Sequence, residues 1–227
     1  MGERRNPFGN AAAVAGYVTE TPKKVPGLAD LHRMVTLLLA ERADGDAKIL
    51  VVGAGGGLEL GAMAGARAGW RFAGVDPSAA MLDIARQVTA PVSDRIDLVE
   101  GLVDAAPDGP FDGATCLLVL HFLDRAERVR TLTEIRRRLR PGAALVVAHH
   151  TKPEDGDATR WLARSVAFGD RTGGDAAEAR ASAAVMAERL PLLTPAEEEA
   201  VLREAGFSEV ALFWAALSFR GWVAVAG

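Results

Sequence analysis

The sequence has a single cysteine and no long apolar run. Cys116 stands alone among 227 residues, which excludes internal disulfides and cysteine-rich metal sites. No apolar run approaches the roughly 20 residues of a membrane-spanning helix, and residues 1–30 lack the apolar core of a signal peptide. We therefore expect a cytoplasmic protein with no membrane association.

The sequence also has no excess of basic residues. The 26 lysines and arginines are outnumbered by 30 aspartates and glutamates, which gives a formal net charge of -4. The chain as a whole therefore has no general attraction to nucleic acid, and we do not expect a nucleic-acid partner. Its length suits one α/β domain with a full core.

A glycine-rich turn between two apolar runs is the most informative feature that is present. The run at 49–52 leads into Gly53, Gly55 and Gly57, then into a small-residue helix and a second strand that ends on Asp76. Such a β-turn-α-β unit brings backbone close to a ligand at a helix N-terminus, and an acid at the tip of the second strand can bind two ribose hydroxyls. The unit predicts a nucleoside site.

The spacing of the glycines decides which nucleoside is expected. A dinucleotide fingerprint, G-x-G-x-x-G, needs a third glycine for close helix packing, but the two frames of this chain place Leu58 and Leu60 there. The pattern present is G-x-G-x-G. With Asp76 beyond it, the unit resembles the S-adenosylmethionine (SAM) site of class I methyltransferases.

Further segments resemble that family in the same order along the chain. VDPSAAMLDIARQ (75–87) is similar to its second motif, GPFDGATCLLVLHFLD (109–124) to its fourth strand and following loop, and LRPGAALVVAHH (139–150) to the turn into its fifth strand. VPGLADLHRMVTLLLAER (25–42) and LTPAEEEAVLREAGF (193–207) also resemble the carboxy-SAM synthases. This second resemblance covers nearly the whole chain.

The resemblance implies a Rossmann-like α/β fold, with a seven-stranded, mostly parallel sheet, an antiparallel final strand and an N-terminal helical cap. It also implies one domain over 1–227: an arm and helix (1–44), a SAM-binding half (45–150), and a substrate cover with closing strands (151–227).

Apolar patterns predict the individual elements. Apolar residues recur every three or four positions from Leu28, which predicts an amphipathic helix from Leu28 to Arg42. A capping box at Thr194 and Glu197 starts a late helix that Gly206 ends. The expected strands are 49–52, 72–75, 96–100, 114–119, 144–148, 210–217 and 219–226.

The resemblance assigns SAM to the glycine turn, with S-adenosylhomocysteine (SAH) as the product. The expected contacts are Gly53, Ala54, Gly55 and Gly57 at the methionine portion, Asp76 at the ribose, Pro77, Met81, Leu102 and Val103 around the adenine, and Leu117 and Leu118 under the ligand. Three positions depart from the pattern. Val51 and Leu102 replace acids of many relatives, and Leu117 replaces an asparagine of the carboxy-SAM synthases. Contact with the amino group of SAM must therefore come from elsewhere.

Methyl transfer from a sulfonium asks little of the protein. The donor is already activated, so alignment and water exclusion suffice, sometimes with a base for the acceptor proton. His150 or His149 is the candidate base; alternation along a strand sends them to opposite sides, so at most one reaches the substrate. The residues expected at the substrate are Tyr17, His121, His150 and Trp161. No carboxylate motif accompanies the histidines, so we expect no metal.

Two segments leave alternatives open. Residues 125–140 carry seven arginines against two glutamates, which fits an RNA-binding helix or a solvated face; an apolar stripe through Leu132 and Ile135 favours the solvated face. Phe8 and Tyr17 in the N-terminal arm fit a cap over the site or an ordinary helix staple.

Three functions follow from these observations. The leading one is a SAM-dependent methyltransferase with a small-molecule acceptor; the others are a carboxy-SAM synthase-like or RNA-modifying enzyme, and a SAM-binding protein without turnover. Carboxy-SAM synthases use an arginine against the extra carboxylate, and alignment places Ala183 there, with Arg180 as the nearest alternative. We therefore expect ordinary SAM. A homodimer remains open.

Overall fold

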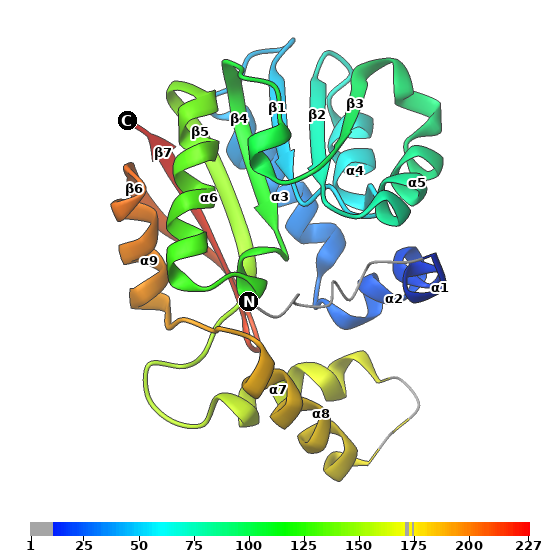
Figure 1. Cartoon of the computed structure of the whole chain (residues 1–227), viewed down its shortest axis with the longest axis vertical. Coiled ribbons are helices and arrows are strands. Elements are labelled where there is room, and N and C mark those ends of the chain that lie inside the picture. The colour runs from blue at the N-terminus through cyan, green and yellow to red at the C-terminus, as the bar shows by residue number, and fades with distance from the viewer. Residues whose placement is uncertain (1–10, 171–172, 174) are drawn as a thin grey trace.

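A seven-stranded sheet forms the centre of the computed structural model, which describes residues 11–170, 173 and 175–227 (Figure 1). The strands are β1 (Lys48–Val52), β2 (Arg71–Asp76), β3 (Ile96–Glu100), β4 (Phe111–Leu117), β5 (Leu139–His150), β6 (Phe207–Ala216) and β7 (Phe219–Ala226). Their order in the sheet is β3-β2-β1-β4-β5-β7-β6. The first five strands are parallel and β7 runs antiparallel to both neighbours, which confirms the predicted fold.

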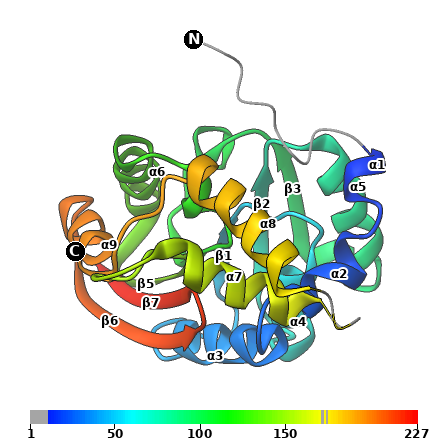
Figure 2. The same cartoon turned by 90° about the horizontal axis from the view of Figure 1, so that it is seen from below.

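Helices cover both faces of this sheet and its carboxyl end. The α-helices are α1 (Ala11–Val14), α2 (Tyr17–Lys24), α3 (Leu28–Ala40), α4 (Leu58–Ala66), α5 (Ala79–Val88), α6 (Arg125–Arg138), α7 (Ala158–Gly169), α8 (Ala176–Arg189) and α9 (Pro195–Glu204), and the short 3-10 helices are η1 (Ala90–Arg95), η2 (Val103–Ala105) and η3 (Leu120–Phe122). Viewed from below, α7 and α8 cross the end of the sheet, with α2 beside them (Figure 2). Within the described residues, no helix has the length and apolar character that a membrane span requires.

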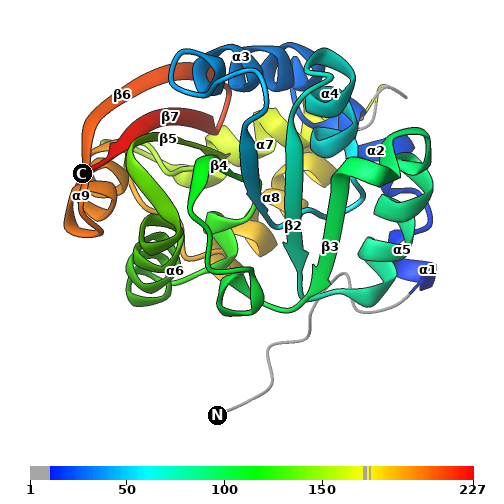
Figure 3. The same ribbon diagram turned by 90° about the horizontal axis from the view of Figure 1, so that it is seen from above.

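The central strands are buried on both faces, which explains their unbroken apolar runs. In β1, Ile49 and Val51 belong to a core that α3 and α4 close, while Leu50 and Val52 belong to a core that α6 and α9 close. The view from above shows these two helix layers on either side of the sheet (Figure 3). The N-terminal arm, with α2, and the cover, with α7 and α8, lie over the carboxyl ends of the parallel strands.

The structure shifts some predicted boundaries. The helix from Leu28 ends at Ala40, and β5 begins at Leu139 because α6 stops one residue earlier. Strand β4 ends at Leu117, because Leu118 takes a left-handed φ of 60° that breaks the extended run. The late capping box is confirmed: the Thr194 hydroxyl accepts from the Glu197 N–H, and the Glu197 carboxylate accepts from the Thr194 N–H.

Candidate functional site

The glycine turn between β1 and α4 is shaped by two positions that only glycine fits. Gly53 has a φ of 77°, and a Cβ there would lie 2.1 Å from Cγ2 of Val119. Gly57 has a φ of 78°, and a Cβ there would lie 2.9 Å from the Cα of Ala85 on α5. L-residues with a side chain rarely take this conformation. The turn is therefore a fixed backbone cradle at the N-terminus of α4.

Asp76 lies at the end of β2 and is held against this cradle. One carboxylate oxygen accepts from the Gly55 N–H and the other from the Ser78 N–H, each at 2.9 Å. Burial raises the pKa of Asp76, and these two hydrogen bonds oppose the rise. Each oxygen keeps acceptor capacity, so the carboxylate can still receive two hydroxyl groups.

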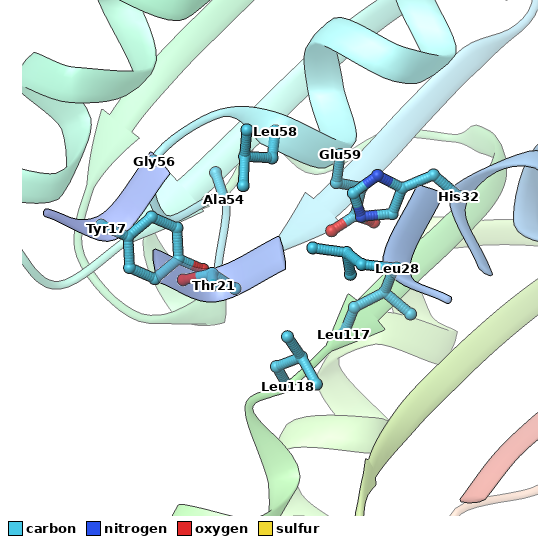
Figure 4. A pocket seen from close by; sticks show the side chains of 11 residues that line it. Tyr17, Thr21, Leu28, His32, Ala54, Gly56, Leu58, Glu59, Leu117 and Leu118 are labelled. Atoms are coloured by element: carbon cyan, nitrogen blue, oxygen red, sulfur yellow. The ribbon is translucent and has the colours of Figure 1, made fainter. Parts of the chain in front are cut away.

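Tyr17 of the arm lies over the same turn (Figure 4). A Cβ on Gly56 would lie 2.6 Å from Cδ1 of Tyr17, so the ring packs directly on the backbone. Burial raises the pKa of Tyr17 to about 12, and the charges of Glu59 and Asp76 add to the rise. This packing supports the predicted position of Tyr17 over the site. The other predicted cap residue, Phe8, lies outside the described residues.

A small cavity remains between the arm, the turn and the end of β4. Its volume is about 20 Å³, room for about one water molecule, and far too small for a nucleoside. It is lined by Tyr17, Thr21, Leu28, His32, Gly53, Ala54, Gly56, Leu58, Glu59, Leu117 and Leu118 (Figure 4). The arm must therefore move before a nucleoside can occupy the cradle.

Glu59 and His32 in this lining were not anticipated from the sequence. Glu59 is 7% exposed, and burial raises its pKa to about 8 while the Thr115 hydroxyl acts to lower it. Burial lowers the pKa of His32 to about 4, so its ring is neutral at pH 7. The only signal in the sequence is an acid on the first turn of an otherwise small and apolar helix.

The other residues predicted to contact SAM lie around the turn. Met81 is buried, with its Cε 3.3 Å from where a Cβ on Gly55 would lie, whereas Pro77 is exposed. The loop after β3 meets Asp76 through a hydrogen bond from the Gly101 N–H to the Asp76 carbonyl. In that loop Leu102 is exposed and Val103 is buried. The structure brings these segments together at one end of the sheet.

The two candidate bases on β5 do face opposite sides. His149 packs against Trp222, and its Nε2 lies 3.0 Å from Glu198 Oε1 on α9. It therefore lies on the face away from the cavity and cannot act as the base. His150 faces the cover: its ring stacks on Phe219 at 3.8 Å and meets His121 edge-on at 5.1 Å.

A chain of hydroxyls holds His150. Its Nδ1 lies 2.7 Å from the Ser218 Oγ, which lies 2.6 Å from the Ser165 Oγ on α7. Burial lowers the pKa of His150 to about 3, and the charge of His149 lowers it further. The predicted substrate residue Trp161 also lies on α7, under the guanidinium of Arg164, but it does not line the cavity.

The arginine-rich segment is paired with other groups of the fold along its whole length. Each of its seven arginines has a partner: Arg125 pairs with Glu204, Arg128 with Glu198, Arg130 with Asp104, Arg136 with the Gly206 carbonyl, Arg137 and Arg138 with Glu134, and Arg140 with Asp112. The predicted solvated face is wrong for Arg128 and Arg138, which are 0% and 2% exposed. Across the described part of the chain, no group of three or more His, Cys, Asp or Glu side chains could hold a metal ion.

Comparison with known proteins assigns this region to a family. Residues 50–147 match the family described as a methyltransferase domain. These residues include the glycine turn, Asp76 and most of β5. No curated protein sequence matched the chain.

Solved structures share the fold. The pyocyanin biosynthetic protein PhzM is 21% identical with a TM-score of 0.65, over 86% of this chain and 54% of that one. Human N-acetylserotonin methyltransferase, solved with SAM, is 17% identical with a TM-score of 0.59, over 94% and 58%. The [4+2]-cyclase SpnF is 25% identical with a TM-score of 0.58, over 79% and 58%. The chain thus spans little more than half the length of these three proteins.

Proposed function

We propose that the chain, whose residues 50–147 match the methyltransferase domain family, binds SAM and transfers the methyl group to a small-molecule acceptor. One observation carries the proposal: the glycine turn and Asp76 meet at the carboxyl ends of β1 and β2, inside the region that matches the methyltransferase domain. This geometry offers backbone to one part of a nucleoside ligand and a carboxylate to its ribose.

The residues of the site fit SAM part by part. Gly53, Ala54, Gly55 and Gly57 receive the methionine portion, Asp76 the two ribose hydroxyls, Pro77, Met81, Leu102 and Val103 the adenine, and Leu117 and Leu118 lie beneath the ligand. Bound SAM supplies a methyl group on a positively charged sulfur. The chain's part is to align an acceptor with that group and to exclude water, for which the arm and α7 are placed.

His150 is the proposed base for an acceptor that loses a proton. Its lowered pKa keeps the imidazole neutral at pH 7, and the Ser218 hydroxyl fixes the orientation of the ring. Replacing His150 with Gln should therefore lower kcat and leave SAM affinity unchanged. His121, in contact with the His150 ring, would line the same acceptor space.

Two features support a small acceptor and ordinary SAM. The arginines of α6 are engaged with partners of the same chain, which leaves little charge for RNA. Ala183, at the position of the carboxy-SAM arginine, is fully buried in a cluster with Leu162 and Leu192, while Arg180 is exposed. An unpaired carboxylate in such a pocket would be costly. The similarity to carboxy-SAM synthases stays a prediction.

Calorimetry with SAM, SAH and NAD tests the first half of the proposal, and we expect binding of the first two alone. A screen of small acceptors with SAH as the readout tests the second half. Chelator should not affect turnover. Carboxy-SAM as the dominant ligand that co-purifies with the protein would overturn the assignment, and a reaction on the acceptor without formation of SAH would point to non-transfer chemistry.

A further inference from the structure

Glu59 is a buried acid for which the proposed mechanism has no role. It lies on the first turn of α4, directly after the glycine turn, and is 7% exposed. Its Oε1 has no hydrogen-bond partner among the described residues. A buried carboxylate oxygen without a donor costs free energy, so its presence needs a compensating interaction.

The position of Glu59 points to the missing donor. Glu59 lines the cavity together with Gly53 and Ala54, which are proposed to receive the methionine portion of SAM (Figure 4). Among the described residues of this lining it is the single carboxylate. The amino acid end of the ligand would therefore lie within reach of this carboxylate.

Strand β1 cannot supply the acid instead. Many relatives carry an acid at the position of Val51, but here this residue is buried in the apolar core and pairs with Thr115 of β4. The Thr115 hydroxyl is close enough to lower the pKa of Glu59, but it lies outside hydrogen-bonding geometry with that carboxylate and has no other partner within the described chain. Glu59 of α4 and Thr115 of β4 thus provide, beside the glycine turn, the polar groups that an acid on β1 provides in those relatives.

We propose that Glu59 binds the α-ammonium group of the methionine portion, an inference that rests on the proposed binding of SAM. The ammonium N–H donates to the free carboxylate oxygen and supplies the countercharge that the pocket lacks. Glu59 gives its own proton to solvent as the ion pair forms. The acid thereby makes binding selective for ligands that carry the amino acid.

The surroundings of Glu59 fix its protonation before binding. The titratable groups that share its surroundings are Tyr17 on α2 and Cys116 on β4, whose pKa values its charge raises, and His32 on α3, which lines the same cavity. No cation stands among these groups at pH 7. Since burial raises the pKa of Glu59 to about 8, the carboxyl holds most of one proton at pH 7 and releases it on pairing.

A structural role for Glu59 makes different predictions. An acid on the first turn of a helix also stabilises the N-terminal end of the helix dipole. That role needs no ligand, and its loss would weaken every ligand of the site equally. The two roles are separated by comparing SAH with 5′-deoxy-5′-methylthioadenosine, which has the same nucleoside and thioether but no amino acid.

The first test is calorimetry with both ligands on the wild type and Glu59→Gln. We expect the variant to bind SAH about 10- to 100-fold more weakly, and methylthioadenosine within about twofold of the wild type. Glu100→Gln, an exposed acid at the end of β3, is the matched control and should change neither affinity. Unchanged SAH affinity in Glu59→Gln, or equal loss for both ligands, would overturn the inference.

The second test needs no variant. Calorimetry of the wild type at pH 7 in buffers of different ionisation enthalpy should show release of about one proton with SAH and none with methylthioadenosine. No release with SAH would contradict the ion pair. If neither ligand binds the wild type at all, the proposed SAM function fails, and this outcome is distinct from failure of the Glu59 assignment.

Discussion

Two buried glutamates on opposite faces of the sheet differ in what surrounds them. Glu198 on α9 is 2% exposed and meets the Arg128 guanidinium and the His149 ring. Burial acts to raise its pKa, but the charges of His149 and Arg128 outweigh burial and hold the pKa below its usual value. Glu59 is buried almost as deeply, no cation among the described residues pairs with it, and burial raises its pKa to about 8.

The difference separates a structural acid from a binding acid. The Glu198 cluster ties α6, α9 and β5 together, and Arg128 also donates to the carbonyls of Leu123 and Pro191. The Glu198 carboxylate therefore has its countercharge and a hydrogen-bond donor within the fold. Glu59 faces a cavity at the glycine turn with one oxygen unpaired. We infer that a buried acid marks a site here when no described residue supplies its countercharge.

The largest effect is expected from a substitution in the Glu198 cluster, which lowers the stability of the fold. Replacing Arg128 with Met leaves Glu198 buried without its guanidinium partner, and should lower the free energy of unfolding by about 3–5 kcal/mol. Urea unfolding at pH 7 measures the change. Arg125→Met is the matched control, because its pair with Glu204 is half-exposed and should cost under about 1 kcal/mol.

The double variant Arg128→Met with Glu198→Leu tests the cause. If the unpaired charge is what destabilises the single variant, most of the loss should be recovered when both charges are removed. A double variant as unstable as the single one would show that Arg128 acts through its packing and its carbonyl contacts instead.

The second prediction concerns the ribose acid on the ligand side of the molecule. Replacing Asp76 with Ala removes an acceptor of charge-assisted hydrogen bonds, worth roughly 1.5–3 kcal/mol, and should weaken SAM binding about ten- to a hundredfold. Calorimetry on the folded variant measures it. Unchanged affinity would mean that the ribose is held elsewhere. The carboxylate of Asp76 would then serve to accept hydrogen bonds from the Gly55 and Ser78 amides.

The sequence predicted the ligand side better than the structural side. Gly53, Gly57 and Asp76 were predicted from their spacing along the chain, which can be read directly from the sequence. The capped α9 was predicted for the same reason. Arg128, in contrast, was expected to be solvated because it lies opposite an apolar stripe, and only the packing of α9 against α6 buries it.

Glu59 could not be found from spacing. Its burial depends on the arm from one side and on Thr115, 56 positions away, from the other. For the two histidines of β5, the sequence predicted the opposite orientations of the side chains but not their neighbours. Strand alternation required His149 and His150 to diverge. Glu198 reaches His149 through the packing of α9, and Ser218 reaches His150 because β7 pairs with β5, so neither neighbour follows from the local sequence.

The third prediction uses pH to sharpen the comparison. The folded-state pKa of Glu59, about 8, lies above its ordinary value of 4.5, so its contribution to stability is full below pH 4.5 and is lost as pH rises through 8. The buried histidines His32 and His150 have lowered pKa values, so their contributions are complete above pH 6.5. The window between pH 6.5 and 8 therefore isolates Glu59.

Within this window the wild type should lose about 1–2 kcal/mol relative to Glu59→Gln. Urea unfolding of both proteins at pH 6.5, 7.5 and 8.5 measures the difference. Glu198→Gln is the opposite control, since a paired acid with a lowered pKa stays ionised across the window and should give no such slope. Parallel pH curves for wild type and Glu59→Gln would show that Glu59 is ionised in the folded protein.

The smallest expected effect is a local change in the arm. Helix α2 has eight residues, contains Pro22 and buries none of its side chains fully, so its own stability is marginal, and Tyr17 anchors it on the glycine turn. A nucleoside cannot enter the present cavity unless this anchor moves, and the bound ligand would then offer the arm a larger surface. Hydrogen exchange should therefore show protection of residues 17–24 rising a few-fold with SAM, while α9, on the structural side, stays unchanged. Equal protection of the arm with and without SAM would contradict its role as a closing cap, and equal gains in the arm and α9 would mean that the ligand stabilises the whole fold instead.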